Sequence, residues 1–121
     1  MKIYYYPSPN FDKNPRLPKS IKVLVIHYTG MQSERESINR LCNPKSKVSS
    51  HFVINENGKV YRLMHDHQIA WHAGKSLWGN FKNLNRNSIG IELVNKGHKF
   101  GYTKFKKKQL SSLVKICLRM L

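Results

Sequence analysis

The chain has 121 residues, enough for a single domain with a modest hydrophobic core. Hydrophobic residues make up 40% of it, and no apolar run approaches the length of a transmembrane helix, which argues against a membrane-embedded protein. The first twenty residues also lack the apolar stretch of a secretory signal, so we expect a cytoplasmic location.

The charge is strongly and unevenly positive. There are 22 Lys and Arg residues against 6 Asp and Glu, a formal net charge of +16. After Glu92 the chain has no acidic residue but eight Lys or Arg, including the run 106–108. Such a field attracts polyanions, either nucleic acid or an anionic cell-wall polymer. The alternative is a lysine-rich solvated surface with no particular partner.

The first half of the chain predicts an arm, a strand and a short helix. Residues 1–20 are rich in Pro and Asn and predict an extended arm over the edge of a domain that spans 21–121. Residues 21–27 contain an unbroken aliphatic run, typical of a central strand buried on both faces. A capping-box pair, Ser33 and Glu36, starts a helix over about 34–42.

The second half adds a hairpin, a long loop, a strand and a helix. Asn57-Gly58 between the strand-like segments 51–55 and 59–64 predicts a hairpin. Residues 65–87 form a long irregular loop, which is usually functional. Residues 88–94 alternate as a strand, and 103–121 form an amphipathic helix. This order predicts an α/β domain with a mixed central sheet flanked by helices.

Glu92 is the most informative acidic residue, because it lies inside an apolar strand. A carboxylate there is costly if it is buried without a partner. Gly90, two residues back on the same face, would let a substrate or metal approach the backbone. An edge-strand Glu paired with a lysine is the alternative.

Histidines are the other candidates for chemistry. His27 follows the aliphatic strand, which would hold it rigidly as a metal ligand or proton carrier, although a lone histidine at a strand end is more often a hydrogen-bonded structural residue. Trp71 and His72 could form a pocket wall or an aromatic cap over the core. His65, His67 and His98 predict polar, exposed positions, and the well-separated Cys42 and Cys117 predict buried free thiols.

Four motifs occur in one order along the chain: Val-Ile-His-Tyr-Thr (25–29), Ser-Ser-His-Phe-Val-Ile (49–54), Ala-Trp-His-Ala-Gly (70–74) and Ser-Ile-Gly-Ile-Glu-Leu-Val-Asn (88–95). Together with Ser-Pro-Asn-Phe (8–11) and Gly-His-Lys-Phe-Gly-Tyr (97–102), they resemble the type 2 N-acetylmuramoyl-L-alanine amidases. These are AmpD/AmiD-like enzymes related to peptidoglycan recognition proteins, and the resemblance runs from about residue 8 to 121.

The resemblance implies a zinc enzyme that cleaves the amide between the muramic acid lactyl group and L-alanine in peptidoglycan or muropeptides. His27 matches the first zinc ligand and Glu92 the general base. Trp71 and His72 match residues near the substrate groove, and His51 matches a histidine beside the site. Because the resemblance implies a substrate in the cell envelope, a periplasmic location is the alternative to the cytoplasm. We also expect a monomer.

The resemblance also implies an incomplete metal site. In the family a second histidine and an Asp or Cys complete the zinc site from a segment after the last long helix, and these residues are absent from this chain. We therefore expect a C-terminally truncated fold, weak or absent zinc binding, and doubtful activity. A catalytically inactive muropeptide-binding module is the alternative function. We expect no specific nucleic-acid binding, because the chain lacks a recognition-helix or stacking signature.

Overall fold

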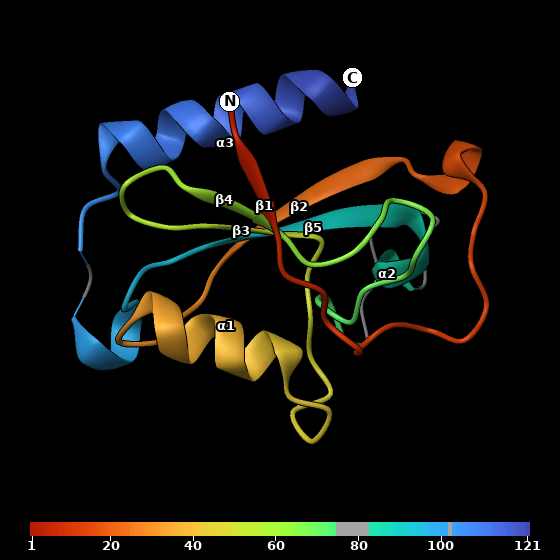
Figure 1. Cartoon of the computed structure of the whole chain (residues 1–121), viewed down its shortest axis with the longest axis horizontal. Coiled ribbons are helices and arrows are strands. Elements are labelled where there is room, and N and C mark those ends of the chain that lie inside the picture. Colours follow the sequence, from red (N-terminus) through yellow and green to blue (C-terminus); the bar gives the residue numbers. More distant parts are fainter. Residues whose placement is uncertain (75–82, 102) are drawn as a thin grey trace.

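The computed structural model describes residues 1–74, 83–101 and 103–121, and all structural statements refer to these residues. A five-stranded sheet in the order β1-β4-β3-β5-β2 forms the centre of the molecule (Figure 1). The strands are β1 Ile3–Tyr5, β2 Val23–Tyr28, β3 Phe52–Ile54, β4 Val60–Arg62 and β5 Ser88–Leu93. The helices are α1 Glu34–Cys42, α2 Leu84–Asn87 and α3 Lys107–Met120, with short 3-10 turns at Pro18–Ser20 and His98–Phe100.

The sheet is mixed, as the order of predicted elements indicates. Strand β5 pairs in parallel with both β2 and β3, whereas β3 and β4 form the predicted antiparallel hairpin. Gly58 in the hairpin turn has φ +86°, and a Cβ there would lie 2.6 Å from the backbone oxygen of Lys108. The turn therefore requires glycine both for its conformation and for its close contact with the start of α3.

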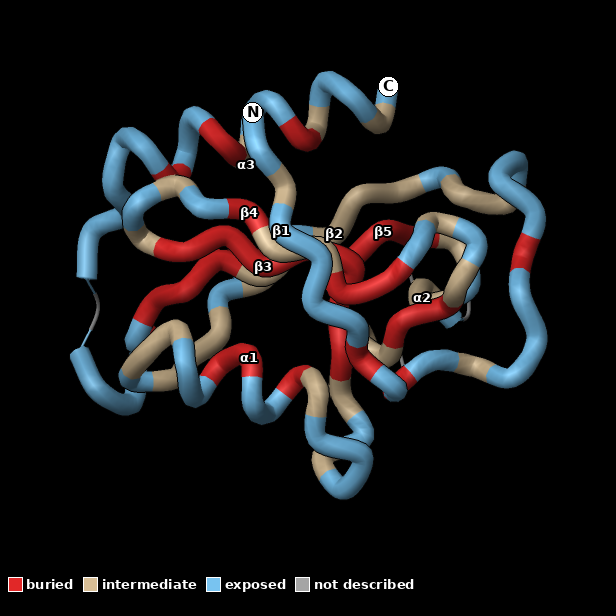
Figure 2. Tube along the Cα trace, viewed as in Figure 1, coloured by how far each residue is buried: buried red, intermediate tan, exposed pale blue. Residues whose placement is uncertain are grey.

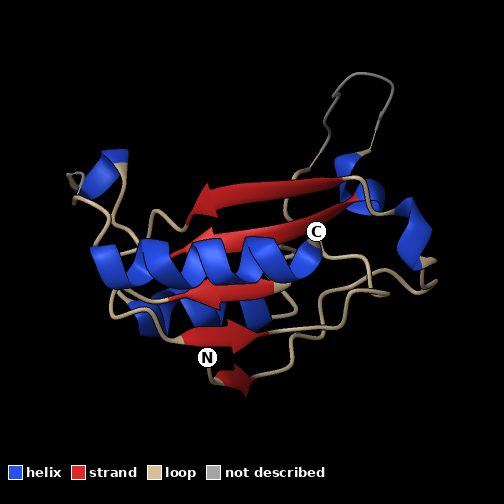
Figure 3. Ribbon diagram, turned by 90° about the horizontal axis from the view of Figure 1, so that it is seen from above, coloured by secondary structure: helices blue, strands red, loops and turns tan. Residues whose placement is uncertain are grey.

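The helices lie on opposite faces of the sheet, with α3 on one side and α1 on the other (Figures 1 and 3). The predicted period of two in β5 is confirmed, since Ile89, Ile91 and Leu93 pack in the cluster that includes Ile116 of α3. Val94 packs on the other face with Leu41 of α1. Figure 2 shows the inner strands β3 and β5 buried throughout except at Glu92, which is half-buried.

The expectation of a central, doubly buried β2 is wrong. Strand β2 ends the described sheet, and its only strand partner there is β5. Val23, Leu24 and Val25 are half-buried, and Ile26 is 48% exposed. An aliphatic run reports that a strand is apolar but not how many neighbours it has, so the pattern could not distinguish an edge from the centre.

The N-terminal arm enters the sheet as well as crossing its edge. Its first strand, β1, pairs in parallel with β4, a pairing that the Pro-rich composition of residues 1–20 did not predict. The arm then continues to Ser8 and Asn10, both buried against the C-terminal end of α1. No helix in the described parts of the chain is long and apolar enough to cross a bilayer.

Candidate active site

The sheet places His27 and Glu92 side by side. They are register partners on the parallel strands β2 and β5, near the C-terminal ends of both. Leu24 and Ile91 pack toward α3, so the alternation of the strands directs His27 and Glu92 to the opposite face, where α1 lies. Two residues 65 positions apart in the sequence thus lie at the same end of the sheet.

Glu92 is a buried carboxyl group on an inner strand. Its Oε2 atom is the one buried side-chain nitrogen or oxygen without a hydrogen-bond partner among the described residues. Burial raises the pKa of Glu92 to about 8, so the group carries its proton at neutral pH in this structure. The alternative of an edge-strand glutamate paired with a lysine is therefore wrong. A carboxyl group that titrates near neutrality is suited to accept and return a proton.

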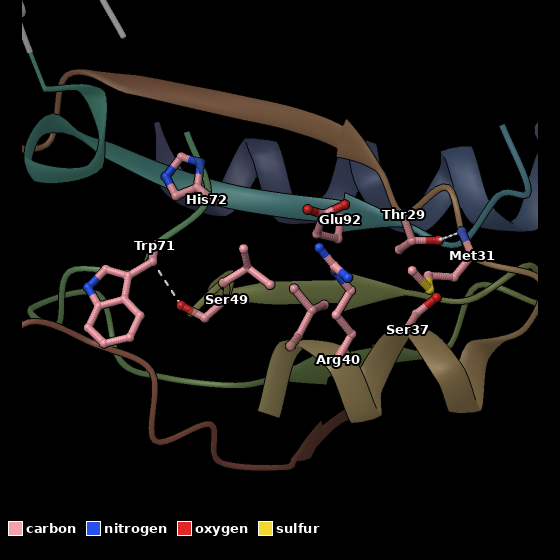
Figure 4. Close-up of a pocket in the computed structure, with 10 residues that line it drawn as sticks. Thr29, Met31, Ser37, Arg40, Ser49, Trp71, His72 and Glu92 are labelled. Carbon is pink, nitrogen blue, oxygen red and sulfur yellow. Dashed lines mark hydrogen bonds between the residues drawn. The ribbon is translucent and has the colours of Figure 1, made fainter. Parts of the chain in front are cut away.

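A pocket of about 110 Å³ opens in front of Glu92 (Figure 4). Residues from α1, β5 and the loops after β2, before β3 and after β4 line it: Thr29, Met31, Ser37, Arg40, Leu41, Val48, Ser49, Trp71, His72 and Glu92. Arg40 extends from the last turn of α1 and points toward Glu92 across the pocket. The sequence analysis did not identify Arg40, because one more cation among 22 carries no signal.

His27 belongs to a chain of polar contacts with His72 and Ser88. Nε2 of His27 lies 3.2 Å from Nδ1 of His72, and Nε2 of His72 lies 2.9 Å from Oγ of Ser88. Ser88 Oγ donates to the backbone oxygen of Leu84 at 2.5 Å, so it accepts from His72 Nε2. His72 Nδ1 is then an acceptor facing His27. Burial lowers the pKa of His27 and, with neighbouring cations, lowers that of His72 to about 3.

The space over Gly90 is occupied by His72, which corrects the expectation that a substrate or metal approaches there. A Cβ at Gly90 would lie 2.6 Å from Cγ of His72. The absent side chain therefore makes room for an imidazole ring that belongs to the site. The backbone of the same loop is held by Asn85, whose Oδ1 accepts from the N–H groups of His72 and Ala73.

His51 lies behind the pocket rather than in it. Its side chain is fully buried, and its ring packs edge-on against that of His72. Nδ1 accepts from the N–H of Gly90 at 3.1 Å, and Nε2 lies 2.8 Å from the backbone oxygen of Gln68. Burial lowers the pKa of His51 to about 4. With both ring nitrogens engaged, His51 supports the site and offers no group to a substrate.

Trp71 lines the pocket as a half-buried side chain. Its Nε1 donates to Oδ1 of Asp12 in the arm at 2.6 Å, and its backbone N–H donates to Oγ of Ser49. Trp71 is thus part of the pocket wall. The predicted loop 65–87 continues beyond it, but residues 75–82 lie outside the described residues.

The remaining candidates lie away from this pocket. His65 and His67 are exposed, as predicted. Their rings stack with a centroid distance of 5.4 Å. His98 is also exposed. Cys42 and Cys117 are free, as predicted, but half-buried instead of fully buried.

The described residues do not assemble a zinc site with three protein ligands. Within residues 1–74, 83–101 and 103–121, no group of three or more His, Cys, Asp or Glu side chains is placed to hold a metal ion. His27 contributes one imidazole, and its Nε2 lies 3.2 Å from Nδ1 of His72. Tetrahedral protein zinc sites use three or four such ligands, so this donor set does not fit the ion on its own.

Comparison with known proteins identifies the family of this chain. A family model described as N-acetylmuramoyl-L-alanine amidase matches residues 17–121. The chain belongs to this amidase family. Within it the chain is of the AmpD/AmiD type: it is 43% identical over 84 residues to the N-acetylmuramoyl-L-alanine amidase AmiD of Escherichia coli (strain K12), and that match covers 64% of this chain and 29% of AmiD.

Two further comparisons define how far the amidase likeness extends. The chain is 33% identical over 103 residues to the 1,6-anhydro-N-acetylmuramyl-L-alanine amidase AmpD of Haemophilus influenzae, covering 71% of this chain and 55% of AmpD. The solved E. coli AmiD, in complex with the substrate anhydro-N-acetylmuramic acid-L-Ala-D-γ-Glu-L-Lys, superposes with a TM-score of 0.74 and 32% identity, covering 84% of this chain and 43% of that one. This amidase chain therefore spans between about a third and about half of the length of the relatives it matches.

Proposed function

We propose that this chain acts on muropeptides or peptidoglycan at the amide that joins the muramic acid lactyl group to L-alanine. The observation that carries the proposal is the buried, unpartnered carboxyl group of Glu92, which faces a pocket beside His27 in a chain of the amidase family. The solved relative that holds a muramyl peptide substrate supports the same class of ligand.

In this proposal Glu92 is the general base and then the general acid. Its carboxylate takes a proton from a water molecule as the water oxygen bonds to the amide carbonyl carbon. The same proton passes to the amide nitrogen as the C–N bond breaks, which leaves a lactyl carboxylic acid and a free L-alanine amine. Since the pKa of Glu92 is about 8, the base form of the free protein increases as the pH rises toward 8.

Zinc is the cofactor that the family resemblance implies, and His27 is the residue of this chain proposed to bind it. When bound, zinc supplies Lewis-acid polarisation of the carbonyl group and a more acidic water. His72 would orient the His27 imidazole through its Nδ1 acceptor, as groups hydrogen-bonded to metal ligands commonly do. Because the described residues provide no three-ligand set, we expect the metal to bind weakly to these residues alone.

A muropeptide-binding module without catalysis is the second candidate. The same absence of a three-ligand set among the described residues favours it. The pocket, the Trp71 wall and the positive charge would serve binding equally well, because muropeptide stems carry carboxylates.

The test is release of stem peptide from a purified muramyl tripeptide, followed by liquid chromatography and mass spectrometry with and without added zinc. Cleavage by the wild type that is lost in Glu92→Gln, but kept in Glu36→Gln, would support the proposal. Glu36 is a matched control because it is an exposed acid on the neighbouring helix α1. Saturable binding without cleavage would favour the binding module. The absence of both binding and cleavage would refute both candidate functions.

A further inference from the structure

A second hollow adjoins the Glu92 pocket near the C-terminal end of α1. Met31, Asn39, Arg40, Asn43, Lys45 and Ser46 line it. Met31 and Arg40 also line the Glu92 pocket, so the two depressions share a wall. A ligand that reaches Glu92 can therefore extend over Arg40 toward Lys45 without leaving the protein surface.

The polar groups of this hollow divide into engaged and free ones. Oγ of Ser46 donates to the last turn of α1, 2.5 Å from the backbone oxygen of Arg40. Oδ1 of Asn43 accepts from the N–H of Lys45 at 3.0 Å. By contrast, no hydrogen bond or ion pair within the described part of the chain engages the Arg40 guanidinium or the Lys45 ammonium group. Among the described residues, the hollow thus presents two cations without an ion-pair partner, of which Arg40 also faces Glu92 across the shared wall.

The loop that carries Lys45 is held by a buried side chain. Asn10 is 2% exposed, and its Nδ2 lies 2.9 Å from the backbone oxygens of both Asn43 and Val48. Oγ of Ser8 also donates to the backbone oxygen of Leu41 at 2.6 Å. These contacts from the N-terminal arm fix both ends of the loop, so the backbone at Lys45 is preorganised instead of mobile.

The lining of both depressions contains one acidic residue, Glu92, and it lies at the inner end. A ligand that fits would place an amide at Glu92 and negative charge farther out, over Arg40 and Lys45. Arginine binds carboxylates through two parallel hydrogen bonds, which suits it to recognise such a group at the lip of a pocket.

We propose that the hollow formed by Arg40 and Lys45 is a carboxylate subsite, which binds the free α-carboxylate of a γ-linked D-glutamate in the stem peptide. The inference rests on the proposed function, because that function places the L-alanine amide at Glu92. It adds a preference that the family assignment does not contain: this chain discriminates stems with a free α-carboxylate from stems in which that group is amidated.

The test measures binding and not turnover. N-acetylmuramic acid-L-Ala-D-γ-Glu-L-Lys and its D-glutamate α-amide are titrated into the intact chain by isothermal calorimetry, in EDTA and at physiological ionic strength. Wild type should bind the acid about tenfold more tightly than the amide, the usual scale of one charge-assisted hydrogen-bonded pair. The double variant R40Q/K45Q should bind the acid and the amide with equal affinity.

The matched control is K115Q/R119Q, which removes one Lys and one Arg from exposed positions on α3, across the sheet from α1. Retention of the tenfold preference in this control supports a local subsite. Equal loss in both double variants would show a bulk charge effect and overturn the inference. So would equal binding of acid and amide by wild type, or a preference that survives in R40Q/K45Q. If wild type binds neither ligand, the proposed function itself fails.

Discussion

His27 and Glu92 are direct register partners, but they occupy unequal positions in the sheet: His27 is on the edge strand β2 and Glu92 on the inner strand β5. This inequality explains their different environments. Glu92 lies between β2 and β3 with its Oε2 atom buried, whereas the outer edge of β2 has no strand partner in the described residues. The Glu92 carboxyl group therefore lies in a low-dielectric environment, and the His27 imidazole lies beside it on the edge strand.

Glu92→Gln should make the free energy of unfolding less dependent on pH. The folded-state pKa of about 8 lies above the unfolded value of 4.5, so the unfolded chain loses this proton first. Wild type should therefore lose stability as the pH rises from about 4.5 to about 8, by on the order of 4 kcal/mol. Urea unfolding at pH 5 and pH 8 measures the difference, and an equal pH dependence in the variant would contradict the burial argument.

Gly90→Ala should destabilise the protein by about 1–3 kcal/mol, because its Cβ would overlap the His72 ring. The chain offers an internal control for this clash. His72→Ala removes the ring, so the double variant should recover part of the loss and show a favourable coupling energy. Denaturant unfolding of the four proteins of the cycle gives that energy. Additive effects would mean that the two residues do not compete for the same space.

Gln109→Ala should cost about 2 kcal/mol, since it removes a buried side-chain donor from two backbone carbonyl groups, although that of Ile54 keeps the N–H of Val94 as a donor. Gln109 is 1% exposed, and its Nε2 lies 3.0 Å from the backbone oxygens of Ile54 and Val94. It thereby joins α3 to the ends of β3 and β5. The exposed Gln32 is the matched control, and its replacement by alanine should change the unfolding free energy by less than about 0.5 kcal/mol.

Removal of metal should have little effect on the stability of these 121 residues. A ligand that binds only the folded state stabilises it by an amount that grows with the logarithm of ligand concentration over Kd, and the described residues offer no three-ligand site. The melting temperature in EDTA should lie within about 1 °C of that in stoichiometric zinc. An increase of several degrees with zinc, abolished by His27→Ala but not by His98→Ala, would contradict this expectation.

The sequence predicted the local elements well where one pattern dominated. The Asn57-Gly58 turn, the capping pair of Ser33 and Glu36 and the alternation in 88–94 each concern neighbours a few residues apart, which is why they could be read directly. The first strand of the arm was missed because its pairing with β4 joins residues almost sixty positions apart.

The candidate site shows the same difference between local patterns, which the sequence predicted, and long-range contacts, which it did not. The sequence alone determined that His27, His72 and Glu92 follow or occupy strand-like segments, and the motif order indicated the family. Only the tertiary structure decided that β2 is an edge strand, that His72 fills the space over Gly90, and that Arg40 faces Glu92 across the pocket. Local patterns report the periodicity and polarity of one segment, whereas burial, pKa and the free or engaged state of a charge depend on what other segments bring against it.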